Sequence, residues 1–474
     1  MFEMIIRNGT IIDGTGRDRY VADIGINDGK IVKIGEIKES SKNIIDAENK
    51  LVTPGWVDVH THYDGQATWD PILAPSSWHG VTTVVMGNCG VGFAPVKPKD
   101  REFLIELMEG VEDIPGAALS EGINWQWESF PEYLDALESF PRAIDVATQV
   151  PHGAIRAYVM GERCNSDYAP TKEEVNQMAE LVREGVEAGA LGFSSSKTLL
   201  HKDIKGEYMP GTFSGNEEML ALGLGMKGLN NSVFELVSDH LGEDEEWQWV
   251  KDFQKQTGLT VTLIATTAPA YKNNKMYNLA EQARIEGYEI RPQAAGRPTG
   301  VLHGLQSSFH VFVGHPTWRK ELASLKHEEL VARLRDPATK KKILSEETTI
   351  KNELLQDIPS LMAQVFPLGE NPNYEPEFKD IVAGIARELK LDVMEVMYDL
   401  LLKGEGKELF YQPLGGYHTY DLEPQKKLLE HPNVLFGLSD GGAHCGVIAD
   451  AGMPTFIMTH WGRDRTRGEK LSLE

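Results

Sequence analysis

Two histidines separated by a single residue are the side chains in this sequence best suited to chemistry. His60 and His62 close an apolar run that begins at Trp56. Because residues i and i+2 of a β-strand point to the same side, a strand ending here turns both imidazoles in one direction. Imidazole nitrogen is a good ligand for zinc and related divalent ions, and two ligands on one rigid element lose little entropy on binding. The pair therefore predicts a divalent metal site, although two packed or solvated histidines would show the same spacing.

Asp440 and Cys89 follow apolar runs in the same way. Asp440 comes after the run 434–438 and precedes two glycines, and Cys89 lies between Gly87 and Gly90. A carboxylate in such a place can contact a metal ion and accept a proton from water, which is the role of a general base. Flanking glycines let the backbone pass close to a ligand. The ordinary alternatives are a turn aspartate and a small buried thiol.

The elements that must position these residues are apolar, β-branched segments that alternate with longer helical patterns. The expected strands cover residues 56–60, 82–86, 144–150, 190–193, 232–237, 260–264, 288–292 and 434–438. Helical patterns lie between several of them, as at residues 172–188 and 278–286. The alternation is typical of a parallel sheet with crossover helices, and eight strands make a (β/α)8 barrel of the α/β class. Active sites of such barrels occupy the C-terminal ends of the strands.

Two segments fall outside the repeating barrel pattern. Residues 1–55 consist of short β-rich runs separated by turns such as Asn8-Gly9, which predicts a small β-unit. The last two expected strands are separated by about residues 301–432, far more than an ordinary loop, so this segment must be a structured insertion. Its middle, residues 318–347, is rich in Lys, Glu, Leu and Ala and should be helical. We therefore expect a β-unit at 1–55 and a barrel at 56–474 that carries the insertion before its last strand.

Composition and charge argue against several classes of partner. The formal net charge is −24 at pH 7, which opposes binding to nucleic acid or to an anionic membrane surface. Three cysteines cannot all pair, which favours a reducing compartment. The N-terminus lacks the pattern of a signal peptide, and no apolar run approaches the roughly 18 residues that a membrane span requires. We expect a cytoplasmic protein that acts on a small molecule, with a homo-oligomer left open.

Together these motifs resemble the amidohydrolase superfamily, and within it the D-aminoacylase (N-acyl-D-amino-acid deacylase) branch. The likeness covers nearly the whole chain and rests on residues 8–14, 54–62, 87–90, 189–194 and 439–441. It implies a barrel with a small N-terminal β-sandwich. It also implies that Cys89 is a metal ligand in place of a carboxylated lysine and that Asp440 is the catalytic acid and base. The activity implied is hydrolysis of the amide bond of an N-acyl-D-amino acid, with zinc as the expected cofactor.

The sequence departs from the family pattern at the remaining metal ligands and at the C-terminus. The family supplies one histidine after strand five and one after strand six. His240 is the candidate for the first, with Asp239 as a competitor, whereas residues 263–269 contain no histidine. The expected ligand set is His60, His62, Cys89, His240 and Asp440. The family also returns past strand eight to complete its small β-domain, whereas this sequence stops at Glu474, so we expect an incomplete sandwich with exposed strand edges.

Other residues have more than one interpretation. His444 or His303 are substitutes for the missing strand-six histidine, although the spacing gives no argument for either. Lys197, near strand four, is a candidate for carboxylation, but a plain surface lysine explains it better. Arg291 and Arg297 are candidates for holding a substrate carboxylate. Salt bridges to neighbouring acids are the simpler explanation for both, given the excess of acidic residues.

Three functions agree with these features. The first is a metal-dependent hydrolase of a linear carbon–nitrogen amide bond. The second keeps the same superfamily and changes the substrate to a cyclic amide or a lactone. The third is a non-catalytic relative with a degraded metal site, which serves binding or assembly. The missing strand-six histidine favours the third function, whereas the intact histidine pair and Asp440 oppose it.

Overall fold

The computed structural model describes residues 1–165, 168–229, 232–265, 275–349 and 362–474. The chain divides into two compact units, residues 1–56 with 456–474 and residues 57–455. The domain boundary expected at residue 55 stays a prediction, because compactness alone does not show that either unit folds by itself. Among the described residues, no helix has the length and apolar character needed to cross a membrane.

The smaller unit contains a five-stranded sheet. Its strands are β1 (Phe2–Ile11), β2 (Tyr20–Asn27), β3 (Lys30–Gly35), β4 (Ser41–Asp46) and β5 (Leu51–Val52), in the order β3-β2-β1-β4 with β5 beside β1. β1 runs antiparallel to β2 and parallel to β4 and β5. The expected Asn8-Gly9 turn is instead an irregularity inside β1, where Asn8 has a φ of 58° and the register shifts before Gly9. The described part of this unit therefore shows one sheet layer.

The larger unit contains the expected barrel, and each of the eight expected segments contains a strand. The strands are β6 (Trp56–Asp58) with β7 (His60–Thr61), β8 (Val81–Met86), β9 (Asp145–Thr148) with β10 (Val150–Pro151), β11 (Gly192–Lys197), β12 (Val233–Ser238), β13 (Thr260–Ile264), β14 (Ile290–Ala295) and β18 (Leu435–Gly441). One sheet has the order β10-β11-β12-β13-β14-β18-β7 and the other the order β6-β8-β9. Because β6 with β7 and β9 with β10 are each one strand interrupted at a single residue, the two sheets follow each other around the barrel.

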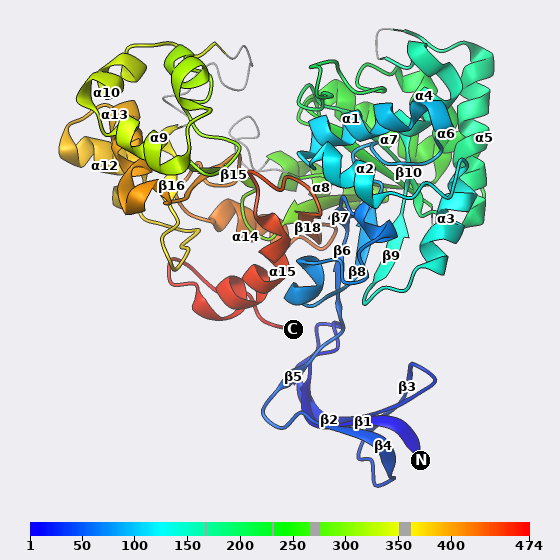
Figure 1. Cartoon of the computed structure of the whole chain (residues 1–474). Coiled ribbons are helices and arrows are strands. Elements are labelled where there is room, and N and C mark those ends of the chain that lie inside the picture. Colours follow the sequence, from blue (N-terminus) through cyan, green and yellow to red (C-terminus); the bar gives the residue numbers. More distant parts are fainter. Residues whose placement is uncertain (166–167, 230–231, 266–274, 350–361) are drawn as a thin grey trace. The chain divides into compact units, whose positions relative to one another are not determined.

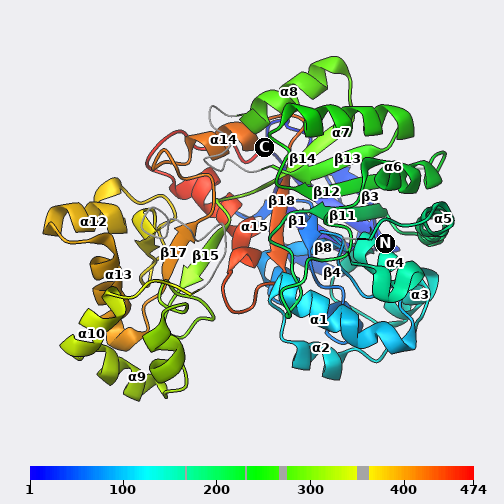
Figure 2. The same ribbon diagram turned by 90° about the horizontal axis from the view of Figure 1, so that it is seen from above.

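Crossover helices surround these strands (Figures 1 and 2). The helices of this layer are α3 (Phe130–Ser139), α4 (His152–Met160), α5 (Lys172–Ala188), α6 (Asn216–Gly225), α7 (Asp244–Thr257) and α8 (Lys275–Glu286). α5 begins where expected because Thr171 accepts the backbone N–H of Glu174 and the Glu174 side chain accepts that of Thr171. The helix buries Met178 and Val182 on one face. Helices of this kind cover the apolar outer face of the barrel strands.

Side chains along a strand point alternately into the barrel and out toward the helices, so the position on the strand decides which of them enter the barrel. Phe193 of β11 stacks on Phe234 of β12 with ring centroids 4.5 Å apart, and Phe234 also packs against Phe253 of α7. Because successive side chains of a strand point to opposite faces, the residues that follow these phenylalanines face the interior. Ser194 and Glu235 are those residues, and both are fully buried. An ionisable residue, Glu235, thereby enters the barrel from β12.

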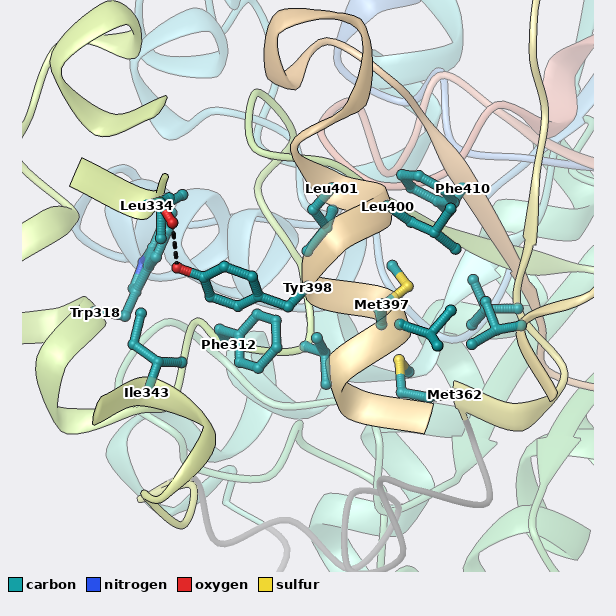
Figure 3. Packing of buried hydrophobic residues seen from close by; sticks show 14 of the residues in the cluster. Phe312, Trp318, Leu334, Ile343, Met362, Met397, Tyr398, Leu400, Leu401 and Phe410 are labelled. Atoms are coloured by element: carbon teal, nitrogen blue, oxygen red, sulfur yellow. Dashed lines mark hydrogen bonds between the residues drawn. The ribbon is translucent and has the colours of Figure 1, made fainter. Parts of the chain in front are cut away.

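The insertion forms a lobe with its own core. Its antiparallel sheet consists of β15 (Gly300–His303), β16 (Phe366–Pro367) and β17 (Phe410–Pro413), and its helices include α9 (His327–Leu334), α10 (Pro337–Leu344), α12 (Val382–Leu389) and α13 (Val393–Leu401). Phe312, Trp318, Met397 and Tyr398 lie in one buried apolar cluster, shown in Figure 3. Tyr398 satisfies its hydroxyl by donating to the carbonyl of Leu334 at 2.8 Å. The expected helical character of residues 318–347 is confirmed, whereas the small sheet was not expected from the sequence.

Candidate metal centre

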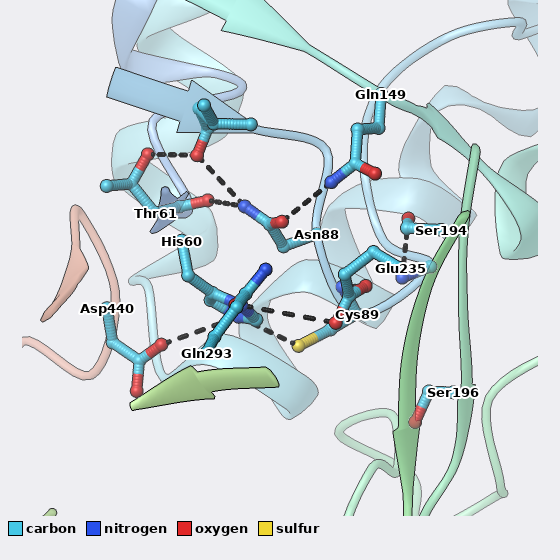
Figure 4. Close-up of polar contacts among 12 residues, drawn as sticks. His60, Thr61, Asn88, Cys89, Gln149, Ser194, Ser196, Glu235, Gln293 and Asp440 are labelled. Carbon is cyan, nitrogen blue, oxygen red and sulfur yellow. Dashed lines mark hydrogen bonds and ion pairs between the residues drawn. The ribbon is translucent and has the colours of Figure 1, made fainter. Parts of the chain in front are cut away.

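Three potential metal ligands meet at the ends of neighbouring barrel strands. His60 lies on β7, His62 follows it, and Cys89 follows β8. Their ligand atoms all lie within 4.8 Å of one another, and all three residues are buried. Cys89 Sγ is 3.3 Å from His60 Nε2 (Figure 4). The structure therefore brings these three predicted residues together.

Asp440 approaches the same point from β18. Its Oδ1 is 3.6 Å from His60 Nε2 and 3.8 Å from His62 Nε2. Both Asp440 and Cys89 have left-handed backbone conformations, with φ values of 51° and 56°. This conformation is uncommon for residues other than glycine, and such strain clusters at functional sites. Four donors of the type that zinc accepts, two imidazoles, a thiol and a carboxylate, thus converge.

The far nitrogens of the two imidazoles face further polar side chains. His60 Nδ1 is 2.8 Å from Gln293 Oε1, on β14. Because an amide oxygen only accepts, Nδ1 carries the proton in this contact and leaves the Nε2 lone pair directed at Cys89 and Asp440. Nδ1 of His62 is 3.4 Å from Oε1 of Glu112. Histidine ligands of metal ions are usually oriented by such outer partners.

Hydrogen bonds fix the loop that carries Cys89. Gly87 has a φ of 73°, and a Cβ there would lie 2.2 Å from the carbonyl oxygen of Gln149, so only glycine fits. Asn88 accepts a hydrogen bond from Gln149 Nε2 at 2.8 Å. The Cys89 N–H donates to Glu235 Oε2 at 2.9 Å. The position of the thiol is therefore set by the neighbouring strands as well as by its own loop.

The centre concentrates buried carboxyl groups. Burial raises the pKa of Asp58 to about 8, that of Glu235 to about 8 and that of Asp64 to about 7. Burial also raises the pKa of Asp440 and holds that of Glu112 well above its usual range. Carboxylates so close to one another repel when ionised, and a cation among them would relieve that repulsion. The electrostatics of the centre therefore suit a cation.

The nitrogen and sulfur donors respond to burial in opposite ways. Burial lowers the pKa of His60 to about 4, so its imidazole is neutral near pH 7 and able to act as a ligand. Burial, reinforced by Glu235, raises the pKa of the Cys89 thiol well above its usual range. A coordinated thiol is deprotonated by the metal ion itself. The donor set fits a zinc-type ion, and such an ion would supply the charge that the thiolate needs.

His240 is placed apart from this group. Its side chain is 52% exposed, and its Nδ1 is 2.8 Å from Oε1 of Glu243. β12 ends at Ser238, so His240 belongs to the loop beyond the strand. Residues 266–269 of the expected strand-six motif lie outside the described residues.

The alternative candidates also have definite surroundings. Lys197 contacts Glu246 at 3.4 Å, lies over the ring of Trp249 and is only 12% exposed, so it is a largely buried, ion-paired lysine rather than the expected surface lysine. His303 Nε2 is 2.6 Å from Gln412 within the sheet of the lobe. His444, in contrast, lies near the centre, with its Nε2 3.4 Å from Glu112 Oε2.

Arg291 and Arg297, the two candidates for binding a substrate carboxylate, both form ion pairs with acidic residues. Arg291 contacts Glu289 at 3.0 Å, and Arg297 contacts Asp450 at 2.5 Å while buried at 2% exposure. The structure thus favours the salt-bridge interpretation of both.

Three polar residues beside the centre were missed by the sequence reasoning. Glu235 interrupts an apolar strand at an inward position, which is a signal that the sequence contained. Gln293 lies one residue beyond the expected seventh strand, so a longer strand would have included it. Glu112 ends a helix, α1 (Arg101–Glu112), and nothing in its local sequence distinguishes it from a surface glutamate.

Comparison with known proteins places this geometry in a family. A sequence model of the amidohydrolase family matches residues 43–349. The D-aminoacylase of Alcaligenes xylosoxydans xylosoxydans is 33% identical over 195 residues, which are 41% of this chain and 37% of that protein. An uncharacterised protein of Mycobacterium tuberculosis is 34% identical over 224 residues, which are 45% of this chain and 36% of that protein. The chain thus matches little more than a third of the length of these curated relatives.

Solved structures show the same fold. A D-aminoacylase crystal structure matches with a TM-score of 0.62 and 20% identity, covering 98% of this chain and 81% of that one. An N-acyl-D-glutamate deacylase from Bordetella bronchiseptica, crystallised with zinc and a phosphonate inhibitor, matches with a TM-score of 0.57 and 23% identity, covering 93% of this chain and 76% of that one. With the family match over most of the barrel, these findings show that the chain belongs to the amidohydrolase family.

Proposed function

We propose that this amidohydrolase is a metal-dependent hydrolase of linear amide bonds and that its centre is formed by His60, His62, Cys89 and Asp440. The observation that carries the proposal is the convergence of His60, His62 and Cys89 at the strand ends, with Asp440 Oδ1 3.6 Å from His60 Nε2. The buried carboxyl groups around them support a cation rather than an apolar ligand. His240 is exposed and is left out of the proposed ligand set.

Zinc is the ion proposed for the centre. His60 and His62 would hold it through nitrogen and Cys89 through sulfur, a donor combination that zinc accepts readily. A divalent ion bound there supplies Lewis acidity, which polarises an amide carbonyl and lowers the pKa of water. Gln293 and Glu112 lie against the Nδ1 atoms of His60 and His62 and would keep the two imidazoles oriented toward the ion.

Asp440 is proposed as the proton carrier. Its side chain is 14% exposed, and its Oδ1 lies within 4 Å of the buried Nε2 atoms of both His60 and His62. Its carboxylate would take a proton from the attacking water at Oδ1 or Oδ2 and pass it to the leaving nitrogen of the amide. Burial raises the pKa of Asp440 and so strengthens it as a base. One residue thereby acts first as base and then as acid.

The proposed substrate class comes from the relatives. A D-aminoacylase, an N-acyl-D-aspartate deacylase and an N-acyl-D-glutamate deacylase are among the proteins to which the chain is similar. An N-acyl-D-amino acid is therefore the first substrate to test. Arg291 and Arg297 are not proposed as its carboxylate clamp, because both are paired with acidic residues.

The test compares Asp440→Asn with the parent on a panel of N-acyl-D-amino acids, cyclic amides and lactones. Asp135 on α3 is exposed, so Asp135→Asn is a matched control. We expect Asp440→Asn to lower kcat by about 10²–10⁴-fold with a comparatively small change in KM, since proton transfer acts chiefly in the transition state. Parental kcat in Asp440→Asn would refute the mechanism. A zinc-loaded parent that hydrolyses none of these compounds would favour the non-catalytic alternative.

A further inference from the structure

A buried carboxylate outside the proposed ligand set lies behind His62. Glu112, the last residue of α1, is 1% exposed. Its Oε1 is 3.4 Å from His62 Nδ1, and its Oε2 is 3.4 Å from His444 Nε2. Both ring nitrogens of His62 and Oε1 of Glu112 are buried without a hydrogen-bond partner within the described residues. One carboxylate therefore faces an imidazole of the centre on one side and an imidazole of the loop after β18 on the other.

The same end of α1 also holds the backbone of that loop. The N–H of His444 donates to the carbonyl oxygen of Glu112 at 2.5 Å, and the N–H of Cys445 donates to that of Asp113 at 3.3 Å. The N–H of Gly446 donates to Asp113 Oδ2 at 3.1 Å. Asp113 ends the helix in a left-handed conformation with a φ of 50°. The loop that follows β18, beginning at Gly442, is thus tied to the helix end by backbone and side-chain hydrogen bonds.

Helix stability does not explain a glutamate in this place. An ionised carboxylate at the C-terminal end of a helix would face the negative end of the helix dipole, and burial already raises the pKa of Glu112 well above its usual range. Burial of a carboxyl group without complete hydrogen bonding costs further free energy. Groups that cost stability in this way are found where a site needs them. Glu112 lies between the imidazoles of His62 and His444, and we take the orientation of these two rings to be the reason for its place.

We propose that Glu112 is a positioning residue that orients His62 toward the cation and, through His444, holds the loop that directly follows Asp440 and the end of β18. This inference rests on the proposed function. Through the Nδ1 side, a carboxylate holds the ring of His62 in the orientation that turns Nε2 toward the centre, and it makes the ligand nitrogen more basic. Through His444, Glu112 keeps the carboxylate of Asp440 at its distance from the ring nitrogens of His60 and His62. A single buried side chain then sets two of the four donors relative to each other.

The first experiment measures metal binding in Glu112→Ala, Glu112→Gln and the parent. Glu102, on the exposed side of α1, provides the control variant Glu102→Ala. Zinc affinity is measured by competition with a chromophoric chelator, and the cobalt(II)-loaded proteins are compared by visible absorption. We expect Glu112→Ala to lose about 10–100-fold in zinc affinity, as is typical for outer partners of metal ligands, and to shift the cobalt spectrum. Glu112→Gln keeps the shape of the side chain and should lose several-fold, whereas Glu102→Ala should match the parent.

Parental affinity and an unchanged cobalt spectrum in the Glu112 variants would overturn the proposal. If Glu112→Ala fails to fold, as judged by circular dichroism, the isosteric Glu112→Gln decides the outcome by the same criterion. A parent protein that binds neither zinc nor cobalt contradicts the proposed function itself, so the two failures are distinguishable.

The second experiment tests the link to the loop. His444→Gln should lower kcat and should weaken zinc binding less than Glu112→Ala does, because it loosens Asp440 alone rather than both Asp440 and His62. In the Glu112→Ala background, the same substitution should have little further effect on kcat, since the two residues act as one unit. Independent, multiplicative losses in the double variant would show that His444 does not act through Glu112 and would overturn this half of the proposal.

Discussion

Replacement of Cys89 by alanine removes the only sulfur among the four proposed donors. Structural zinc sites with four protein ligands bind with roughly 10–16 kcal/mol, which is about 3 kcal/mol for each ligand. A loss of about 3 kcal/mol corresponds to roughly two powers of ten in affinity. Cys89 Sγ lies 3.3 Å from His60 Nε2, close enough for both atoms to bind the same ion, so the variant would lose a direct ligand. We therefore predict that Cys89→Ala weakens zinc binding about 100-fold.

The assay is a zinc titration against a chelator of known affinity, with the other two cysteines as controls. Cys164 packs in a separate apolar cluster with Ala157 and Met160, and Cys445 is an exposed loop residue. Cys164→Ala and Cys445→Ala should bind zinc as the parent does. Thermal unfolding of the zinc-free proteins shows whether Cys89→Ala keeps the fold. Equal zinc affinity in all three cysteine variants would refute the assignment and leave Cys89 as a buried apolar residue.

Three further predictions concern stability and loop geometry. Burial opposes ionisation of Glu218, but His152 and Arg156 outweigh it and lower its pKa to about 2. This carboxylate should contribute about 3 kcal/mol above pH 4.5 that disappears as the pH falls toward 2, and urea unfolding with no such loss would contradict this. Phe312→Ala should lower the free energy of unfolding of the lobe by about 3–5 kcal/mol in denaturant titrations, because the side chain is buried in its core. Gly87→Ala should reduce zinc affinity in the chelator assay, because the added Cβ collides with a carbonyl oxygen and must displace the Cys89 loop. A parental free energy of unfolding in Phe312→Ala, or a parental zinc affinity in Gly87→Ala, would contradict the respective prediction.

The barrel could be predicted from the sequence because its strands are marked locally. Runs such as 260–264 are rich in β-branched residues, and β13 spans Thr260–Ile264 as expected. The histidine pair could be predicted in the same way, since two residues spaced by two on a strand point their side chains to the same side. Such features depend on neighbours in the sequence and need no knowledge of the fold.

The surroundings of the centre could not be predicted in the same way. Glu112 gains its importance only because the end of α1 lies beside His62 and the loop after β18, which are far away in sequence. His240 shows the opposite case, since it follows a strand as a ligand would but lies two residues beyond the end of β12 and is exposed. Side-chain direction just past a strand end is set by the loop, and the sequence pattern does not encode it.

The most direct test of the central claim is the metal content of the purified protein and of the double variant His60→Ala/His62→Ala, measured by mass spectrometry of the bound elements. We expect the zinc-replete parent to retain bound zinc after exhaustive dialysis. The double variant should lose that zinc and keep its circular dichroism spectrum, because it lacks two of the four donors but no barrel strand. Equal zinc content in the parent and the double variant would show that His60 and His62 do not hold the ion.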